Sequence, residues 1–256
     1  MVCNFGNYTG NLQALFGGSG GSFQKNTLSA LPGARKVILK DFTHDGRIDV
    51  LVLFAQGDER VSLFVNDGAR KFSEKILLRF PPVYGSSYFE TGDYNNDGFF
   101  DILTTNGDNM DYSIVLKPYH GVRLHLNDGK MNFTESVFLP MHGASMAMAH
   151  DYDLDGDIDI AAVAFFPDFE KHSDEGFVYF ENQGDNQFTA RTTPAGTLAR
   201  WLIMETADYD HDGDVDIFLG ALNFPTPVAA INKKWGDKPI PFLILNNQAV
   251  DQSARR

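Results

Sequence analysis

The sequence has a single cysteine, Cys3, among its 256 residues. One cysteine excludes an intramolecular disulfide framework and any zinc site built from cysteines. The sequence also has no run of about 18 apolar residues, so it contains no transmembrane helix. The first ten residues, MVCNFGNYTG, have neither a basic start nor an apolar stretch, and they therefore contain no signal peptide. We expect the natural N-terminus to lie upstream of Met1.

Basic residues are scarce. Lysine and arginine number 21 against 34 aspartates and glutamates, which gives a formal net charge of -13. This balance excludes a general nucleic-acid binder, because such a protein needs a basic face to displace the counterions of phosphate. The hydrophobic share of 43% and the aromatic share of 13% predict a chain that folds around a core rather than one that is disordered.

The acidic residues are concentrated in four windows of nine residues that share the pattern D-x-[DNT]-x-D-G-x-x-D. They are DFTHDGRID (41–49), DYNNDGFFD (93–101), DYDLDGDID (151–159) and DYDHDGDVD (208–216), and they hold 16 of the 34 acidic residues. Carboxylates this close repel one another unless a cation lies between them, so we expect a divalent ion in each loop. Ordinary acidic surface turns are the alternative, and four copies in one register argue against it.

Calcium suits these loops better than magnesium or zinc, because it accepts about six to eight oxygen ligands in a flexible geometry. We expect side-chain ligands at loop positions 1, 3, 5 and 9, a backbone carbonyl ligand at position 7, and up to four bound Ca²⁺ ions. The glycine at position 6 allows the left-handed backbone that turns the chain around the ion. The expected ligand residues are Asp41, Thr43, Asp45, Arg47, Asp49, Asp93, Asn95, Asp97, Phe99, Asp101, Asp151, Asp153, Asp155, Asp157, Asp159, Asp208, Asp210, Asp212, Asp214 and Asp216.

An EF-hand is excluded, because it needs a bidentate glutamate at position 12 and helices on both sides. Position 12 is occupied by Val52, Thr104, Ala162 and Leu219. Each loop is instead followed by a β-branched apolar run such as IDVLVLFA, which is typical of a buried strand. The loops are therefore predicted to join two strands.

The loops recur with a period typical of a β-propeller. Their first aspartates stand at 41, 93, 151 and 208, which is 52 to 58 residues apart. Each period also contains a hairpin, SLFVNDGARKF, LHLNDGKMNF or YFENQGDNQF, in which a phenylalanine follows an asparagine by six residues. In the last unit, the distance of 38 residues from the loop aspartate puts this asparagine at position 246. Each unit then has four strands, and four-stranded units around an axis form an all-β propeller.

The two ends of the sequence predict incomplete blades. LQALFGGSGGSF repeats the hairpin before the first loop, and PFLILNNQ supplies a third strand after the last loop. We expect a single propeller segment over 1–250 with about five blades, either a part of a longer propeller, which is favoured, or a ring with two defective blades. The expected divisions are a partial blade at 1–33, blades at 34–85, 86–143 and 144–198, a partial blade at 199–250 and a disordered tail at 251–256.

These units resemble the FG-GAP/VCBS repeats of integrin alpha-chain propellers and of many bacterial secreted proteins. The resemblance covers about residues 1 to 248 and is carried by the four loops and the hairpin turns. It implies a seven-bladed ring, an extracytoplasmic location and a role in binding or adhesion. Thr43 departs from the usual aspartate or asparagine at its loop position.

Insertions concentrate on the face opposite the calcium loops, where long loops on a rigid ring commonly carry recognition. Aromatic planes with nearby donors suit sugars or extended polypeptide, so a carbohydrate or a protein is the expected ligand, and oligomeric state stays undetermined. Packing of these aromatics onto the ring is the alternative for any one of them. The residues expected on this ligand face are Tyr84, Tyr88, Lys117, Tyr119, His120, His142, Arg200, Trp201 and Trp235.

Catalytic motifs are weak. GGSGG at 17–21 matches the nucleophile-elbow string G-x-S-x-G but occupies a hairpin turn, where no strand-to-helix turn is expected. Glu90 and Glu205 share a register on first strands and could approach the central channel. The sequence favours a calcium-binding module over two alternatives, a propeller domain of a polysaccharide lyase and a structural spacer in a larger surface protein.

Overall fold

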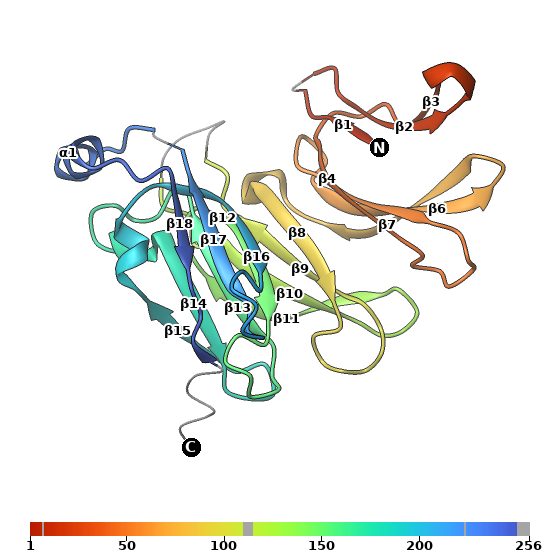
Figure 1. Cartoon of the computed structure of the whole chain (residues 1–256). Helices are drawn as coiled ribbons and strands as arrows, with labels where there is room; N and C mark the ends of the chain where they lie inside the picture. Colours follow the sequence, from red (N-terminus) through yellow and green to blue (C-terminus); the bar gives the residue numbers. More distant parts are fainter. Residues whose placement is uncertain (7, 110–114, 223, 250–256) are drawn as a thin grey trace.

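The computed structural model describes residues 1–6, 8–109, 115–222 and 224–249, and the tail expected at 251–256 lies outside this part. It forms five antiparallel sheets with three, four, four, four and three strands (Figure 1). The first sheet contains β1 (Val2–Asn4), β2 (Asn11–Gly17) and β3 (Phe23–Ser29). The second contains β4 (Ala34–Lys40), β5 (Asp49–Phe54), β6 (Arg60–Gly68) and β7 (Lys71–Arg79).

The third sheet contains β8 (Ser86–Gly92), β9 (Asp101–Asn106), β10 (Gly121–Asn127) and β11 (Phe133–Pro140). The fourth contains β12 (Ala144–His150), β13 (Asp159–Ala164), β14 (Phe177–Asn182) and β15 (Phe188–Thr192). The fifth contains β16 (Trp201–Ala207), β17 (Asp216–Ala221) and β18 (Phe242–Leu245). Sequence order equals spatial order within every sheet, so each sheet is an up-and-down blade.

In the four-stranded blades, burial increases from the fourth strand at the rim toward the second strand. β5, β9 and β13 are buried along their whole length, as the apolar runs after the loops predict. The fourth strands β7, β11 and β15 have no fully buried residue. β12 contacts β8 on one side and β16 on the other, so first strands line the centre of the array.

The hydrophobic core lies between successive blades rather than within one of them. Separate clusters of buried side chains join the first sheet to the second, the second to the third, the third to the fourth and the fourth to the fifth. The first and last sheets stand apart in Figure 1, and the described chain leaves the ring open. The expectation of an all-β, incomplete propeller is therefore confirmed.

The connections divide between the two ends of the blades. Because strands alternate in direction, the acidic loops and the hairpin turns share one end, and the insertions share the other. The insertions and blade links contain short 3-10 turns, η2 (Pro82–Tyr84), η3 (Ser173–Gly176) and η4 (Pro194–Thr197), and a further turn, η1 (Ser19–Gly21), lies in the first hairpin. The last insertion forms a helix, α1 (Ala229–Asp237), which the sequence analysis did not predict. No helix within the described residues has the length and apolarity needed to cross a membrane.

Candidate metal centres and binding face

The four acidic loops adopt one backbone conformation, and each joins the first strand of a blade to the second. The glycines at position 6 have φ between 83° and 99°, as their place in the pattern predicts. Position 4 is also left-handed, with φ of 58° at His44 and 61° at Leu154. This second left-handed position was not predicted, because only one of the four loops has an asparagine there, Asn96, and the others have histidine or leucine.

The aspartate at position 1 closes each loop on itself. Its Oδ2 accepts the backbone N–H of the position-6 glycine, at 2.8 Å between Asp41 and Gly46 and at 3.1 Å between Asp151 and Gly156. The loops at 93 and 208 repeat this bond. The position-5 carboxylate accepts the N–H two residues later in all four loops. The acidic side chains therefore hold the loop in shape before any ion is considered.

The aspartate at position 9 reaches across to the hairpin of the same blade. Asp159 is fully buried, and its Oδ1 accepts the backbone N–H of Asn182 at 2.8 Å, while its Oδ2 accepts from Tyr152 N–H at 3.2 Å and from the Tyr179 hydroxyl at 2.6 Å. The Asn182 amide donates in return to the carbonyl of Ile158 at 3.1 Å. The other three loops repeat this exchange with Asn66, Asn127 and Asn247.

The last of these partners differs from the one expected. Counting along the sequence placed the fourth hairpin asparagine at 246, but Asn247 donates its N–H to Asp216 at 2.7 Å. Asn246 instead donates from its side-chain amide to Asp210 at 2.6 Å. The difference of one residue follows from strand register, because β18 pairs with β17 through Leu245 opposite Ile217.

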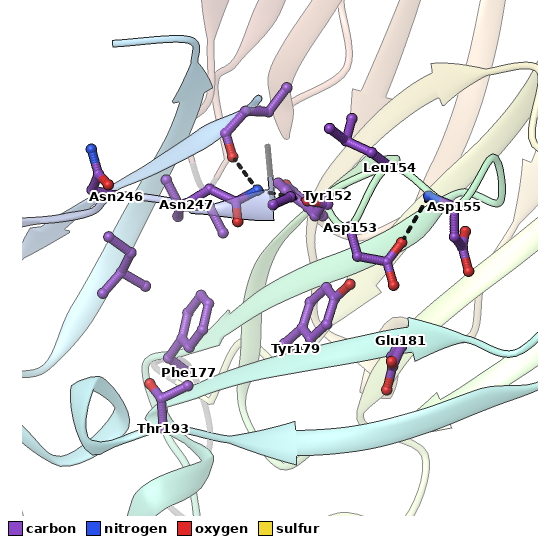
Figure 2. Close-up of a pocket in the computed structure, with 14 residues that line it drawn as sticks. Tyr152, Asp153, Leu154, Asp155, Phe177, Tyr179, Glu181, Thr193, Asn246 and Asn247 are labelled. Atoms are coloured by element: carbon purple, nitrogen blue, oxygen red, sulfur yellow. Dashed lines mark hydrogen bonds between the residues drawn. The ribbon is translucent and has the colours of Figure 1, made fainter. Parts of the chain in front are cut away.

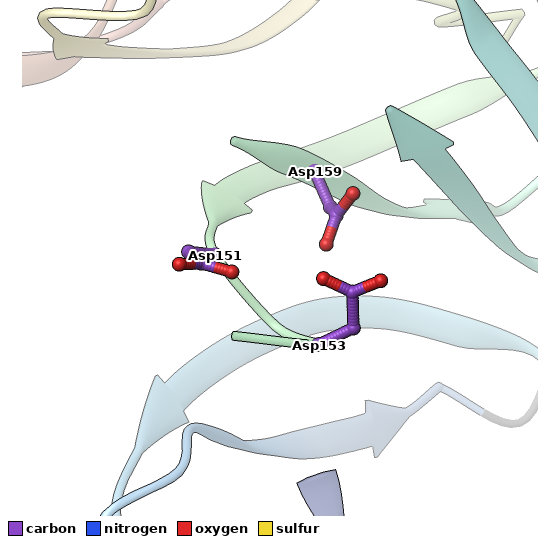
Figure 3. A group of neighbouring side chains, drawn as sticks. All are labelled: Asp151, Asp153 and Asp159. Carbon is purple, nitrogen blue, oxygen red and sulfur yellow. The ribbon is translucent and has the colours of Figure 1, made fainter. Parts of the chain in front are cut away.

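Two loops bring three carboxylates together at positions 1, 3 and 9. One carboxylate oxygen from each of Asp151, Asp153 and Asp159 lies within 4.8 Å of the others, and Figure 3 shows the three groups converging on one point. Asp208, Asp210 and Asp216 form the equivalent group in the next blade. The position-5 and position-7 aspartates of these loops, Asp155, Asp157, Asp212 and Asp214, stand outside the two groups.

The electrostatics of the Asp151 loop fit a bound cation. Oδ1 of Asp151 is buried and has no hydrogen-bond donor from the protein. Burial and the neighbouring carboxylate of Asp159 raise the pKa of Asp153 to about 6. Three acids held together with an unused buried oxygen form an all-oxygen donor set, which is the set that Ca²⁺ prefers. A cation at this point would offset both the burial and the repulsion that raise the pKa of Asp153.

The other two loops compensate their charge with the chain's own groups. In the loop at 41, the Thr43 hydroxyl donates to Asp49 at 3.2 Å, and the Arg47 guanidinium forms an ion pair with Asp45. In the loop at 93, the Asn95 amide donates to Asp97 at 2.9 Å. Neither loop forms a group of three acidic side chains within the described residues.

Four of the residues expected on the ligand face are buried, so fewer residues remain there to contact a ligand. Trp201 has no exposed surface and donates its indole N–H to the carbonyl of Ala195 at 2.9 Å. Arg200 is 2% exposed and donates to three backbone carbonyls. Burial lowers the pKa of His120 to about 4, so its imidazole is neutral. Trp235, on α1, is also buried. These four side chains pack the insertions onto the ring.

A second group of the expected residues stays partly exposed. The rings of Tyr84 and Tyr119 stack with their centroids 5.1 Å apart and an interplanar angle of 11°. They come from different insertions, and the guanidinium of Arg123 lies 4.7 Å from the Tyr84 ring. Lys117, between β9 and β10, and His142, between β11 and β12, are half-buried. Arg123 lies on β10 and was not identified from the sequence.

The central strands bring ionisable groups together around Glu90. Burial raises the pKa of Glu90 to about 7, and its Oε1 accepts the backbone N–H of Ala149 at 2.6 Å. Lys36 on β4 lies over the ring of Tyr88, 3.5 Å from the centroid, and burial lowers its pKa to about 8. Tyr88 therefore belongs to this central group rather than to an insertion. Glu205 contributes charge to the same group, as its shared register suggested.

The family model for the FG-GAP-like repeat matches the chain twice, over residues 41–104 and 151–219. Both matches begin at the first aspartate of an acidic loop. A search of the curated proteins finds no match. Among solved structures, the chain is similar to the GH32 β-fructofuranosidase of Bombyx mori, with a TM-score of 0.39 and 13% identity over 73% of this chain. The similar region is 47% of that protein, so the chain spans about half its length.

Proposed function

Because this chain belongs to the FG-GAP-like repeat family, we propose that it is a calcium-loaded propeller segment that acts outside the cytoplasm as a binding module. The observation that carries the proposal is the pair of aspartate triads, together with the buried and unpartnered Oδ1 of Asp151. Calcium supplies positive charge at the junction of the first and second strands. Four bound ions would change the formal charge from -13 to -5.

The four loops are proposed to differ in affinity, because affinity follows the charge of the ligands. The loops at Asp151 and Asp208 carry carboxylates at positions 1, 3 and 9 and should bind Ca²⁺ most tightly. The loop at Asp93 has an amide at position 3 and should bind less tightly. The loop at Asp41 has a hydroxyl there and an arginine paired with Asp45, so it should bind most weakly.

Calorimetry tests the metal sites directly. Titration of metal-free protein with CaCl₂ should resolve tight and weak sites, and the melting temperature should rise with calcium and fall in EDTA. Asp153→Asn and Asp210→Asn should each remove one tight site. Asp67→Asn makes the same change of charge in an exposed hairpin turn and should leave the titration unchanged. Equal melting temperatures in EDTA and in millimolar CaCl₂ would exclude the proposal.

The proposed ligand contact is the partly exposed part of the insertion face, centred on the stacked Tyr84 and Tyr119. Stacked aromatic planes beside a cationic donor such as Arg123 suit a sugar ring or an extended polypeptide. A glycan and protein array, run with and without a chelator, tests this proposal. Tyr119→Ala should abolish the signal and Tyr8→Ala, at a residue that is 94% exposed on the first sheet, should not.

The proposed location outside the cytoplasm follows from affinity. Loops that bind with dissociation constants of about 10⁻⁴ to 10⁻³ M are filled in extracellular calcium, whereas cytosolic calcium is too scarce to fill them. Dissociation constants below about 10⁻⁷ M for the two triads would remove this argument, because calcium would then be held inside the cell as well.

A further inference from the structure

A phenylalanine on the fourth strand closes the contact between each complete blade and the blade before it. Phe72, Phe133 and Phe188 lie opposite the hairpin asparagines Asn66, Asn127 and Asn182 in strand register. Each ring packs into the cluster that joins its own sheet to the preceding one. Phe23 holds the same place in the first described sheet, and it is 64% exposed.

Around Phe188, this contact is filled. The ring packs among Tyr94 and Leu124 of the third sheet and Ile158 and Ile160 of its own sheet, and no volume remains that a water molecule could enter. Tyr94 is at loop position 2, and Leu124 is three residues before the hairpin asparagine.

The equivalent space between the fourth and fifth sheets is open. A pocket of about 770 Å³ is lined there by Tyr152 at loop position 2, Tyr179 three residues before Asn182, Val215 at loop position 8, and Ile217 on β17. These four residues stand at the same positions as Tyr94, Leu124, Ile158 and Ile160. Figure 2 shows the rings of Phe177 and Tyr179 from β14 forming one wall, with Asn246 and Asn247 opposite. The pocket is therefore the socket of a fourth-strand aromatic ring.

The backbone beside the socket is also open. β18 pairs with β17 and with no other strand among the described residues, so within this part of the chain its outer edge offers N–H and C=O groups to a further strand. The residue six positions after Asn247 is Ser253, so the sequence supplies no aromatic side chain at the position that phenylalanine takes in the other blades.

We propose that the socket and the edge of β18 bind an extended polypeptide strand from a partner protein, antiparallel to β18, with an aromatic residue opposite Asn247. Main-chain hydrogen bonds to β18 would supply affinity, and the ring between Tyr179 and Ile217 would supply specificity, as in other cases of strand addition. The interface continues the arrangement that β7, β11 and β15 already form inside this chain. This site lies between the fourth and fifth sheets, and its lining includes neither Tyr84 nor Tyr119 but does include Asp153 of the acidic loop at 151.

The chain provides its own probe. A labelled peptide with the sequence of residues 184–193, GDNQFTARTT, copies β15 and carries Phe188. In calcium-containing buffer, fluorescence polarisation should show saturable binding to the full chain. The same peptide with alanine in place of phenylalanine should bind at least tenfold more weakly, because the ring makes the buried contact.

Two variants of the chain form a matched pair. Val215→Lys should weaken peptide binding at least tenfold, because it replaces an apolar side chain that lines the socket with a charged one. Ile48→Lys makes the same kind of change at the same loop position in the second sheet, where Ile48 is 53% exposed, and should leave binding unchanged. Melting curves establish that both variants are folded. Slower amide exchange over Phe242–Leu245 on addition of peptide gives a second measurement that does not depend on a variant.

Three results would overturn the proposal. They are absence of peptide binding, equal binding of the phenylalanine and alanine peptides, and protection of amides elsewhere than in β18. Sedimentation provides a further check. If the chain self-associates, and Phe23→Ala both abolishes association and restores access of the peptide, the occupant is β3 of a second copy and not a partner protein.

Discussion

The carboxylate of Asp159 accepts a hydrogen bond from the backbone of Asn182, and the side chain of Asn182 donates one back to the acidic loop. Oδ1 of Asp159 accepts the Asn182 N–H at 2.8 Å, and the Asn182 amide donates to the Ile158 carbonyl at 3.1 Å. Since all four loops repeat the exchange, it links the second strand of each blade to the third. The aspartate at position 9 therefore has a structural role that does not require a metal ion.

This role predicts a large effect of Asp159→Ala in metal-free protein. The substitution leaves the N–H groups of Asn182 and Tyr152 and the Tyr179 hydroxyl without their acceptor, and the cost should be about 3 kcal/mol or more of unfolding free energy. Asp155→Ala removes an exposed carboxylate with one local bond and should cost less than about 1 kcal/mol. Urea denaturation in EDTA measures both. Similar costs for the two variants would show that the exchange contributes little.

The loop at Asp41 should gain affinity for calcium from a single substitution. Thr43→Asp would give this loop the acidic residues at positions 1, 3 and 9 that the loops at Asp151 and Asp208 have. We expect its dissociation constant for Ca²⁺ to fall by about tenfold, because an additional charged oxygen faces the ion. Calorimetry on the variant measures the change, and Ser73→Asp, which adds the same charge on β7, is the control. An unchanged weak site would indicate that Arg47 blocks the loop.

The packing of fourth-strand phenylalanines predicts opposite outcomes for two identical substitutions. Phe188→Ala should lower the unfolding free energy by about 2 to 4 kcal/mol, because the ring packs between two sheets. Phe23→Ala should change it by less than about 0.5 kcal/mol, because that ring is 64% exposed. Chemical denaturation of both variants makes the comparison. A large loss at Phe23 would mean that this ring is covered in solution.

Glu90 should make stability depend on pH. Burial raises its pKa in the folded state from the ordinary glutamate value of 4.5 to about 7, so the folded protein binds the proton more tightly than the unfolded chain does. The resulting stabilisation is present below pH 4.5 and is lost as pH rises to 7, and it amounts to about 3 kcal/mol. Glu90→Gln keeps an acceptor for the Ala149 N–H and should remove this dependence. Unfolding free energies between pH 5 and 7, at fixed calcium, provide the measurement.

The range from pH 5 to 7 separates the titration of Glu90 from that of the neighbouring Lys36. Burial lowers the pKa of Lys36 to about 8, so Lys36 changes its charge above the range in which Glu90 titrates. If the unfolding free energy changes with pH by the same slope in the wild type and in Glu90→Gln, Glu90 has the ordinary pKa of a hydrated glutamate.

Arg200 should be a structural residue. Its Nε donates to the Phe165 carbonyl at 2.7 Å, and its Nη1 donates to the carbonyls of Phe224 and Pro225 at 3.0 and 2.8 Å. Lysine cannot reproduce this fork, so Arg200→Lys should cost about 2 kcal/mol or more. Arg191→Lys, at an exposed ion pair with Glu181, should cost less than about 1 kcal/mol. Thermal unfolding of the two variants tests the difference, and an unchanged melting temperature for Arg200→Lys would contradict it.

Much of the architecture followed from local chemistry. An Asp–Gly pattern that recurs every 52 to 58 residues can be recognised without tertiary contacts, because the turn, the buried strand after it and the hairpin are all encoded within a few residues. The division of the 18 described strands into sheets of three, four, four, four and three was predictable for the same reason. The acids at positions 1 and 3 were identified as neighbours because the loop is too short to separate them.

The remaining features depend on contacts between segments that are far apart in the sequence. Trp201 and Arg200 looked like binding residues because they follow a loop, and only packing against the fourth sheet buries them. Strand pairing selects Asn247 over Asn246, a choice that composition cannot make because the two residues are identical. In the other blade contacts, the ring that fills this space comes from the fourth strand of a blade. The described part of the fifth sheet has no fourth strand, so the socket beside Tyr179 stays open. Local pattern thus determined the repeating unit and its acidic loops, and the packing of one blade on the next decided which side chains are covered and where a surface stays open.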